Sequence, residues 1–135
     1  MQPFAGRATL VSPAITNGPP PAMGTGWMDS FLTECDKLGC TVDAIAAHIY
    51  DSATNIGYYK NYIADLGTRY KRPTLVTEFG AAGSLEQQQA FLREIVPYLN
   101  GLGSVTHFAW FMTAVDNLVK EDTSLTPLGQ AYASA

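Results

Sequence analysis

Hydrophobic residues along the chain alternate between two periods, which predicts strands that alternate with helices. The predicted strands are short apolar runs rich in β-branched and aromatic residues, at 8–12, 42–50, 73–80 and 105–111. The predicted helices carry apolar residues at three- and four-residue spacing, at 26–38, 59–70, 84–99 and from 126 onward. Strand followed by helix, repeated in this way, predicts an α/β fold with a parallel sheet and right-handed crossovers.

Signals at the helix ends sharpen these boundaries. Thr25 is the expected N-cap of the first helix, and Gly39 its C-terminal stop. Ser84 with Gln87 has the spacing of a capping box at the start of the third helix. Pro97 is expected to kink the last turn of that helix. Before the last helix, Thr126 followed by Pro127 reads as an N-cap and a first helical residue.

Polar and aromatic residues gather directly after the predicted strands. Because the carboxyl ends of parallel strands lie at the same edge of a sheet, these side chains should share one face of the molecule. This is the layout of the active face of a (β/α)8 barrel, here in a four-stranded half barrel formed by residues 1–135 as one domain. The residues at the strand ends are Asn17, Tyr50, Asp51, Glu78, Phe79, Trp110 and Phe111.

Glu78 stands out among them, because it ends an apolar run and Gly80 then offers a turn. A glutamate exposed in an ordinary turn would fit this octapeptide equally well. His48 and Tyr50 favour a functional site, because the two-residue period of a strand places them on one face at one end. A long loop at 112–125 also points to function.

Composition and charge exclude several classes of function. Hydrophobic residues make up 47% of the chain and charged residues 15%, which suits a buried sheet and not a disordered segment. The net charge of -4 gives no sign of a positively charged surface that would bind nucleic acid or an anionic membrane. No run approaches a membrane span, and residues 1–7 lack the features of a signal peptide. Cys35 and Cys40 fit either a disulfide at a helix end or two free thiols, and the sequence leaves both open.

Six motifs, in order along nearly the whole chain, resemble a known family. They are Ser12-Pro13-Ala14, Trp27-Met28-Asp29-Ser30-Phe31 with Cys35 and Cys40, Val42-Asp43 leading to His48-Ile49-Tyr50, Thr77-Glu78-Phe79-Gly80, Ala109-Trp110-Phe111, and Leu125-Thr126-Pro127-Leu128-Gly129. This order resembles the Asl1-like glycosyl hydrolase catalytic domain, glycoside hydrolase family 128, which comprises endo-β-1,3-glucanases with a clan A barrel.

The resemblance implies specific roles. It makes the chain strands five to eight of the TIM barrel, with Glu78 as the nucleophile of a retaining glycosidase that acts on β-glucan polysaccharide or oligosaccharide. It implies a secreted protein that needs no metal or other cofactor. Trp110 would offer its apolar ring face to a glucose ring. The predicted substrate-binding residues are His48, Tyr50, Trp110, Phe111 and Asn17.

The sequence also departs from the family. The family's acid/base glutamate lies in an Asn-Glu-Pro motif after the fourth strand, upstream of the segment that matches Ser12-Pro13-Ala14, and no such motif stands in this sequence. Asp51 and Asp116 are weaker substitutes in loops of the same face. We therefore expect a partial catalytic domain that is inactive alone, and that either self-associates or assembles with a missing N-terminal half.

Three alternatives remain at this stage. The first is a non-catalytic, carbohydrate-binding half barrel that keeps the aromatic residues but hydrolyses nothing. The second is a metal-dependent enzyme that uses His48, His107, Glu78 and Asp51 as ligands. The third is a purely structural domain, which the clustering of polar and aromatic residues at strand ends disfavours.

Overall fold

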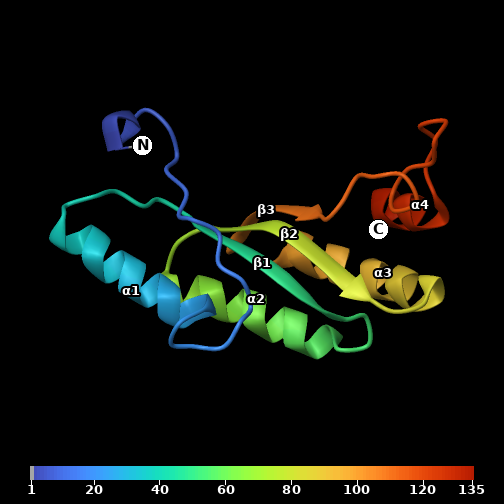
Figure 1. Ribbon diagram of the computed structural model, residues 1–135, viewed down its shortest axis with the longest axis horizontal. Helices are drawn as coiled ribbons and strands as arrows, with labels where there is room; N and C mark the ends of the chain where they lie inside the picture. Colours follow the sequence, from blue (N-terminus) through green and yellow to red (C-terminus); the bar gives the residue numbers. More distant parts are fainter. Residues whose placement is uncertain (1) are drawn as a thin grey trace.

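A computed structural model describes residues 2–135 and shows a parallel sheet of three strands with helices around it (Figure 1). The elements in chain order are η1 (Gln2–Phe4), α1 (Gly24–Lys37), β1 (Ile45–Ser52), α2 (Ile56–Tyr70), β2 (Thr74–Ala82), α3 (Leu85–Gly101), β3 (Val105–Trp110) and α4 (Pro127–Ser134). The strands lie in the order β1-β2-β3, with α2 and α3 as the crossovers between them. The α/β prediction is thus confirmed. Within this part of the chain, no helix is long and apolar enough to cross a membrane.

The strand predicted at 8–12 is not a regular strand. This segment runs parallel to β1 but touches it only through isolated bridges, at Val11–Ala44 and Ile15–Ala47. Pro13 has no N–H to give to a ladder, and the N–H of Ala46 donates to the Ser12 hydroxyl at 3.0 Å instead of to a backbone carbonyl. The sheet of residues 2–135 therefore has three strands, where the sequence predicted four.

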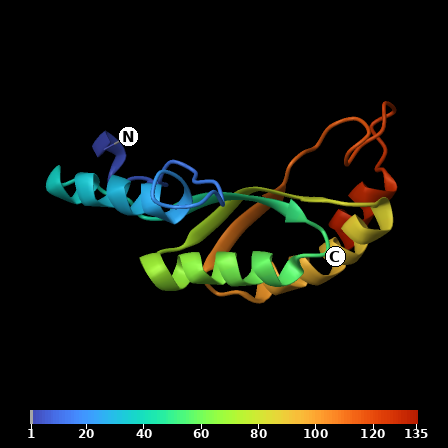
Figure 2. The same cartoon turned by 60° about the horizontal axis from the view of Figure 1, so that its bottom comes forward.

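The core lies between the sheet and its helices. Figure 2 shows α2 and α3 along one face of the sheet. Phe79 of β2 is fully buried there against Phe91 of α3, and Ile49 of β1 belongs to the same cluster. A second cluster brings Met28 of α1 against Ile45. No helix of residues 2–135 covers the opposite face of the sheet (Figure 2). On that face His48 and Glu78 are half-buried and Tyr50 is exposed.

The helix termini agree in part with the predicted caps. The capping box is present: the N–H of Gln87 donates to the Ser84 hydroxyl, and the Gln87 side chain accepts from the N–H of Ser84 at 2.8 Å. Thr126 caps α4, accepting from the N–H of Gly129 at 3.0 Å. The prediction of Thr25 as N-cap is wrong: the N-cap is Met23, and α1 begins at Gly24, two residues before the predicted start at 26. Gly24 has a φ of +54°, which is open to glycine. Pro97 lies inside α3, which continues to Gly101.

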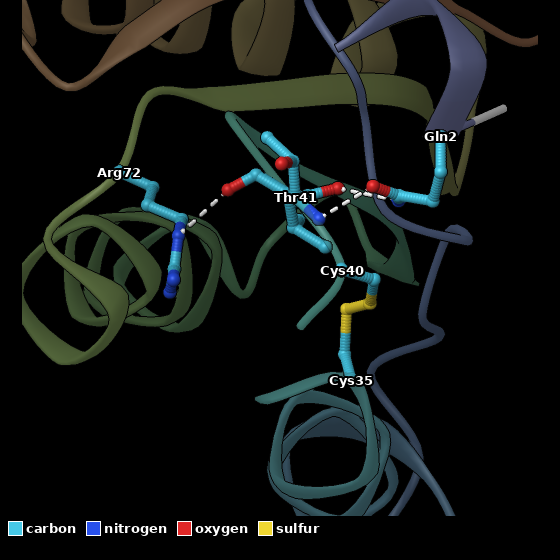
Figure 3. Close-up of a disulfide and its surroundings, with 6 residues drawn as sticks. Gln2, Cys35, Cys40, Thr41 and Arg72 are labelled. Atoms are coloured by element: carbon cyan, nitrogen blue, oxygen red, sulfur yellow. Dashed lines mark hydrogen bonds between the residues drawn. A yellow bond between two sulfur atoms is a disulfide. The ribbon is translucent and has the colours of Figure 1, made fainter. Parts of the chain in front are cut away.

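The cysteines, left open by the sequence, form a disulfide between the last turn of α1 and the chain beyond it (Figure 3). Gly39 takes a φ of +64°, which reverses the chain so that the N–H of Cys40 donates to the carbonyl of Cys35 at 3.0 Å. Next to the bridge, the side-chain amide of Gln2 donates to the Thr41 carbonyl at 3.0 Å and accepts from the Thr41 N–H at 2.7 Å. The approach to β1 is thereby fixed from two sides.

Removing the disulfide should lower stability. For a loop this short, closed by cysteines five positions apart, restriction of the unfolded chain predicts a loss of about 2 kcal/mol in the free energy of unfolding. Urea denaturation of the Cys35→Ser/Cys40→Ser variant against the parent measures it. Reductant should destabilise the parent and leave the double variant unchanged. Equal midpoints for both proteins without reductant would contradict this expectation.

Candidate active site

Glu78 faces the open side of the sheet because β2 contains a bulge. Thr77 has no partner on β1, and the next residue, Glu78, pairs with His48. The extra residue lets Val76 and Phe79, three positions apart, both point into the core beneath the sheet. Glu78 then points the other way. The strand also runs on to Ala82, so the predicted turn at the glycine after Glu78 is wrong.

Three predicted site residues meet at one carboxylate oxygen. The Tyr50 hydroxyl donates to Oε2 of Glu78 at 2.7 Å, and Nδ1 of His48 lies 3.4 Å from the same oxygen. The side chains of His48 and Glu78 are 27% and 30% exposed, so the group is neither sealed in the core nor fully solvated. The expectation that His48 and Tyr50 share one face is confirmed.

The two oxygens of Glu78 are in different situations. Oε2 receives the Tyr50 hydroxyl, whereas Oε1 has no hydrogen-bond partner among residues 2–135. Partial burial of Tyr50 and its hydrogen bond to Glu78 raise the pKa of the Tyr50 hydroxyl above its usual range, so the hydroxyl stays protonated and donates at neutral pH. One oxygen is held in place, and the other is left accessible for chemistry.

Gly80 makes room for this contact. A Cβ at this position would lie 3.0 Å from Cε1 and 3.2 Å from Cδ1 of Tyr50, closer than ordinary side-chain contacts. The Tyr50 ring therefore lies across the glycine on its way to Glu78. The function of Gly80 is close approach within a strand, where the sequence had indicated a turn.

A cavity of about 420 Å³ opens between the ends of β1, β2 and β3. Glu78 and His48 do not line it, and Glu78 is connected to it through its hydrogen bond with Tyr50. Its lining includes Tyr50, Gly80, Trp110 and Phe111. The rings of Tyr50 and Phe111 are 41% and 45% exposed and meet edge to face, with centroids 6.4 Å apart. Exposed aromatic surface next to a carboxylate is suited to a sugar ring, which has apolar C–H faces and polar edges.

Trp110 is placed differently from its predicted role. It is only 6% exposed, because its ring packs edge to face on Phe79 with centroids 5.4 Å apart. Its indole N–H donates to Oδ1 of Asn117 at 2.9 Å and so ties the long loop to the end of β3. The accessible aromatic surface at this edge thus comes from Phe111 and Tyr50. A sugar-binding role for Trp110 stays a prediction.

Asn17 reaches the site, but its side chain is engaged with the protein. Nδ2 donates to the Tyr50 carbonyl at 3.0 Å and to the Tyr58 hydroxyl at 3.1 Å, and Oδ1 accepts from the Tyr50 N–H at 3.2 Å. Both N–H groups of the amide are used. The predicted contact of Asn17 with substrate stays untested, and this geometry leaves its donors no free hydrogen for a sugar.

The other acidic candidates do not join Glu78. Asp51 lines the same cavity, but it follows Tyr50 in the strand and its Oδ1 accepts from the N–H of Ser52 at 2.6 Å and from Nδ2 of Asn55 at 3.3 Å, not from a group at Glu78. Asp116 lies in the loop after β3 with a φ of +64°. Within residues 2–135, no three His, Cys, Asp or Glu side chains are grouped closely enough to hold a metal ion, which gives no support to the metal-dependent alternative.

Sequence reasoning missed one further residue that builds this edge. Tyr59 of α2 is fully buried, and its hydroxyl donates to the carbonyl of Gly80 at 2.7 Å and accepts from the N–H of Asp51 at 2.6 Å. It thereby joins the ends of β1 and β2 beneath the cavity. Its only sequence signal was a place in the apolar stripe of a helix, which does not distinguish a core tyrosine from one that cross-links two strands.

The family described as "Glycosyl hydrolase catalytic core" matches residues 1–132. The chain belongs to this family. Membership confirms the resemblance noted from the six motifs. The Glu78 carboxylate lies within β2 on the uncovered face of the sheet, four residues before the strand ends at Ala82.

Relatives of this glycosyl hydrolase domain include solved β-1,3-glucanases. A curdlan-specific exo-β-1,3-glucanase of family 128 from Blastomyces gilchristii, solved with glucose, is 40% identical with a TM-score of 0.89, over 100% of this chain and 58% of that one. A mutant endo-β-1,3-glucanase from Amycolatopsis mediterranei, solved with laminaripentaose, is 28% identical with a TM-score of 0.83. The match covers 97% of this chain and 60% of that one.

A curated relative is the alkali-sensitive linkage protein 1 of Schizosaccharomyces pombe. It is 28% identical over 142 residues, which cover 93% of this chain and 25% of that protein. The chain thus spans a quarter of this relative and about three fifths of the solved glucanases.

Proposed function

We propose that this chain carries the nucleophile of a retaining β-1,3-glucan hydrolase, and that the nucleophile is Glu78. The observation that carries the proposal is the Glu78 carboxylate, with Oε2 held by Tyr50 and Oε1 without a partner in residues 2–135. Tyr50 also lines an open cavity, together with the exposed ring of Phe111. Oε1 would attack the anomeric carbon as the bond to the leaving oxygen breaks. Water would then hydrolyse the resulting glycosyl ester.

A retaining mechanism needs a second carboxyl group, about 5–5.5 Å from the first, to protonate the leaving oxygen. Asp51 lines the cavity, but its Oδ1 is engaged with Ser52 and Asn55, and Glu78 contacts no second carboxylate among residues 2–135. We propose that the acid comes from a segment outside residues 1–135. The isolated chain would then bind glucan without cleaving it.

The missing segment would also complete the barrel. In this proposal, residues 10–16 with β1, β2 and β3 take the places of strands five to eight, and residues 1–135 are a partial catalytic domain. The open face of the sheet and the greater length of the solved glucanases support it. Self-association is the competing way to cover that face, and light scattering of the purified chain distinguishes a monomer from a dimer.

Two features support the proposed substrate and location. Relatives at 28% and 40% identity are β-1,3-glucanases solved with laminaripentaose and glucose, which favours β-1,3-glucan as the substrate class. The Cys35–Cys40 disulfide is typical of oxidising compartments and supports secretion. The non-catalytic, carbohydrate-binding half barrel is the second candidate, because the exposed rings of Tyr50 and Phe111 would serve binding alone as well.

Two measurements test the proposal. Titration of the ¹⁵N-labelled chain with laminarihexaose should shift the amide signals of residues around Tyr50, Gly80 and Phe111, and cellohexaose should shift them less. Coexpression with the part of the Blastomyces enzyme that this chain does not cover should release reducing ends from laminarin. Binding without hydrolysis in the assembled protein would favour the non-catalytic alternative. Equal shifts with both sugars, or none, would contradict the proposed substrate.

A further inference from the structure

The outer edge of β1, away from β2, is closed by the N-terminal part of the chain. Backbone groups of Ser12 and Ile15 pair with it: the N–H of Ser12 donates to the Ala44 carbonyl at 2.9 Å, and the N–H of His48 donates to the Ile15 carbonyl at 2.7 Å. After Ile15 the chain turns away toward α1. The next backbone groups on this edge belong to Tyr50, two residues beyond His48, and no backbone of residues 2–135 pairs with them on that side.

The carboxamide of Asn17 takes the place of the absent strand. Its Oδ1 accepts from the Tyr50 N–H at 3.2 Å and its Nδ2 donates to the Tyr50 carbonyl at 3.0 Å, the same donor and acceptor pair that a neighbouring peptide would supply. The Tyr58 hydroxyl holds Nδ2 from the other side at 3.1 Å. On its inner edge, Tyr50 pairs with Gly80 of β2. The Tyr50 backbone is thus held on both sides.

We infer that Asn17 is a positioning residue that sets the Tyr50 hydroxyl on Oε2 of Glu78. The inference rests on the proposed function, in which Glu78 is the nucleophile. Tyr50 is 41% exposed, so packing around its side chain does not by itself fix the ring. The position of the Tyr50 backbone, which Asn17 holds, therefore sets the position of the hydroxyl. With two N–H groups and one oxygen already bonded to Tyr50 and Tyr58, Asn17 acts on Glu78 through Tyr50 and not on the sugar.

The chain contains a matched control for this arrangement. In the segment that precedes β1, the Gln2 carboxamide makes the same two-bond pairing with the backbone of Thr41 (Figure 3). Gln2→Leu and Asn17→Leu each remove a carboxamide that pairs with one backbone residue. Only Asn17→Leu does so next to Tyr50. Gln2→Leu therefore controls for a general loss of stability, which would affect the Tyr50 signals alike in both variants.

The test follows Tyr50 by NMR in the 135-residue chain, labelled with ¹⁵N and with ¹³C at the tyrosine Cζ. The titratable groups beside the Tyr50 hydroxyl are Glu78 of β2, which accepts its hydrogen bond, and His48 of β1, whose Nδ1 lies 3.4 Å from the same Glu78 oxygen. In Asn17→Leu, hydrogen exchange at the Tyr50 amide should accelerate about tenfold, and the Tyr50 Cζ titration should move down toward that of an ordinary tyrosine. Gln2→Leu should leave both Tyr50 signals in place.

An unchanged Tyr50 Cζ titration in folded Asn17→Leu would overturn the inference, and so would an equal change in Gln2→Leu. If Asn17→Leu does not fold, Tyr58→Phe decides, because it removes one bond to Nδ2 and keeps the ring. It should move the Tyr50 signals in the same direction by less, and no movement would count against the inference. Laminarihexaose binding, measured on the same samples, tests the proposed glucan function separately from the role of Asn17. No binding by the parent would contradict the glucan function, while the Tyr50 signals would still test the role of Asn17.

Discussion

Glu78→Gln is expected to lower laminarin hydrolysis by the assembled protein by roughly 10⁴- to 10⁶-fold, the scale on which loss of a nucleophile acts. An amide cannot form the glycosyl ester, although its oxygen can still accept the hydrogen bond that Tyr50 donates to Oε2. Laminarihexaose binding should therefore remain while the rate is lost. Reducing-end release and isothermal titration, measured on the same preparation, separate these two effects.

Glu94→Gln is the matched control, because it makes the same chemical change on the exposed face of α3. Its ion pair with Lys60, with N and O 2.7 Å apart, lies at the surface and contributes little to stability. Full activity in Glu94→Gln with loss in Glu78→Gln supports the assignment. Equal activity of the parent and Glu78→Gln would rule out Glu78 as the nucleophile.

Phe79→Ala is expected to cost about 3–5 kcal/mol in the free energy of unfolding. Phe79 is fully buried, and its ring meets Trp110 at 5.4 Å, Tyr132 at 6.2 Å and Phe91 at 6.5 Å between centroids. It therefore joins β2 to α3, β3 and α4. Because a small domain is stable by about 5–15 kcal/mol in total, this single change should bring the chain near its unfolding threshold.

Urea denaturation measures this loss, and Phe79→Leu is the conservative comparison. Leucine keeps most of the buried volume, so its cost should be about 1 kcal/mol. The two residues Glu78 and Phe79 are neighbours on one strand and serve opposite faces, so the core side chain also fixes the direction of the carboxylate. A cost below about 1 kcal/mol for Phe79→Ala would mean that the ring does not hold the sheet to its helices.

Much of the fold followed from local patterns in the sequence. The apolar runs that became β1, β2 and β3, and the capping box at Ser84, depend on residues close together in the chain. The meeting of Tyr50 with Glu78 also followed, because it needs only the two-residue strand period and parallel strand ends at a common edge. Each of these features follows a regular spacing of residue types along the chain, so it can be predicted without a structure.

The rest depended on contacts between distant positions. Asn17 is hydrogen-bonded to the backbone of Tyr50, 33 positions away, and the residues next to Asn17 in the sequence give no sign of this contact. Gly80 was taken for a turn because its partner ring, Tyr50, comes from another strand. Trp110 lines the cavity, but its packing on Phe79, which leaves it 6% exposed, could not be seen from the sequence. Side-chain to backbone bonds of this kind have no periodicity to detect.

The segment around Ser12 and Pro13 shows the same limit. Its β-branched residues indicated a strand, but the missing N–H of proline and the Ser12 hydroxyl, which accepts from Ala46 at 3.0 Å, replace regular pairing. The segment runs parallel to β1, as predicted, but it does not form the regular hydrogen-bonded strand that was predicted.

The central claim is that Glu78 forms a covalent bond with the sugar. A fluorinated laminaribioside with a dinitrophenyl leaving group tests it directly, because fluorine slows hydrolysis of the ester while the good leaving group keeps its formation fast. The assembled protein is treated with this reagent, digested and analysed by mass spectrometry. One added fluoroglycosyl group is expected on the peptide that contains Glu78, and none in Glu78→Gln. A label on a different carboxylate, or turnover by an inverting route with no label, would contradict it.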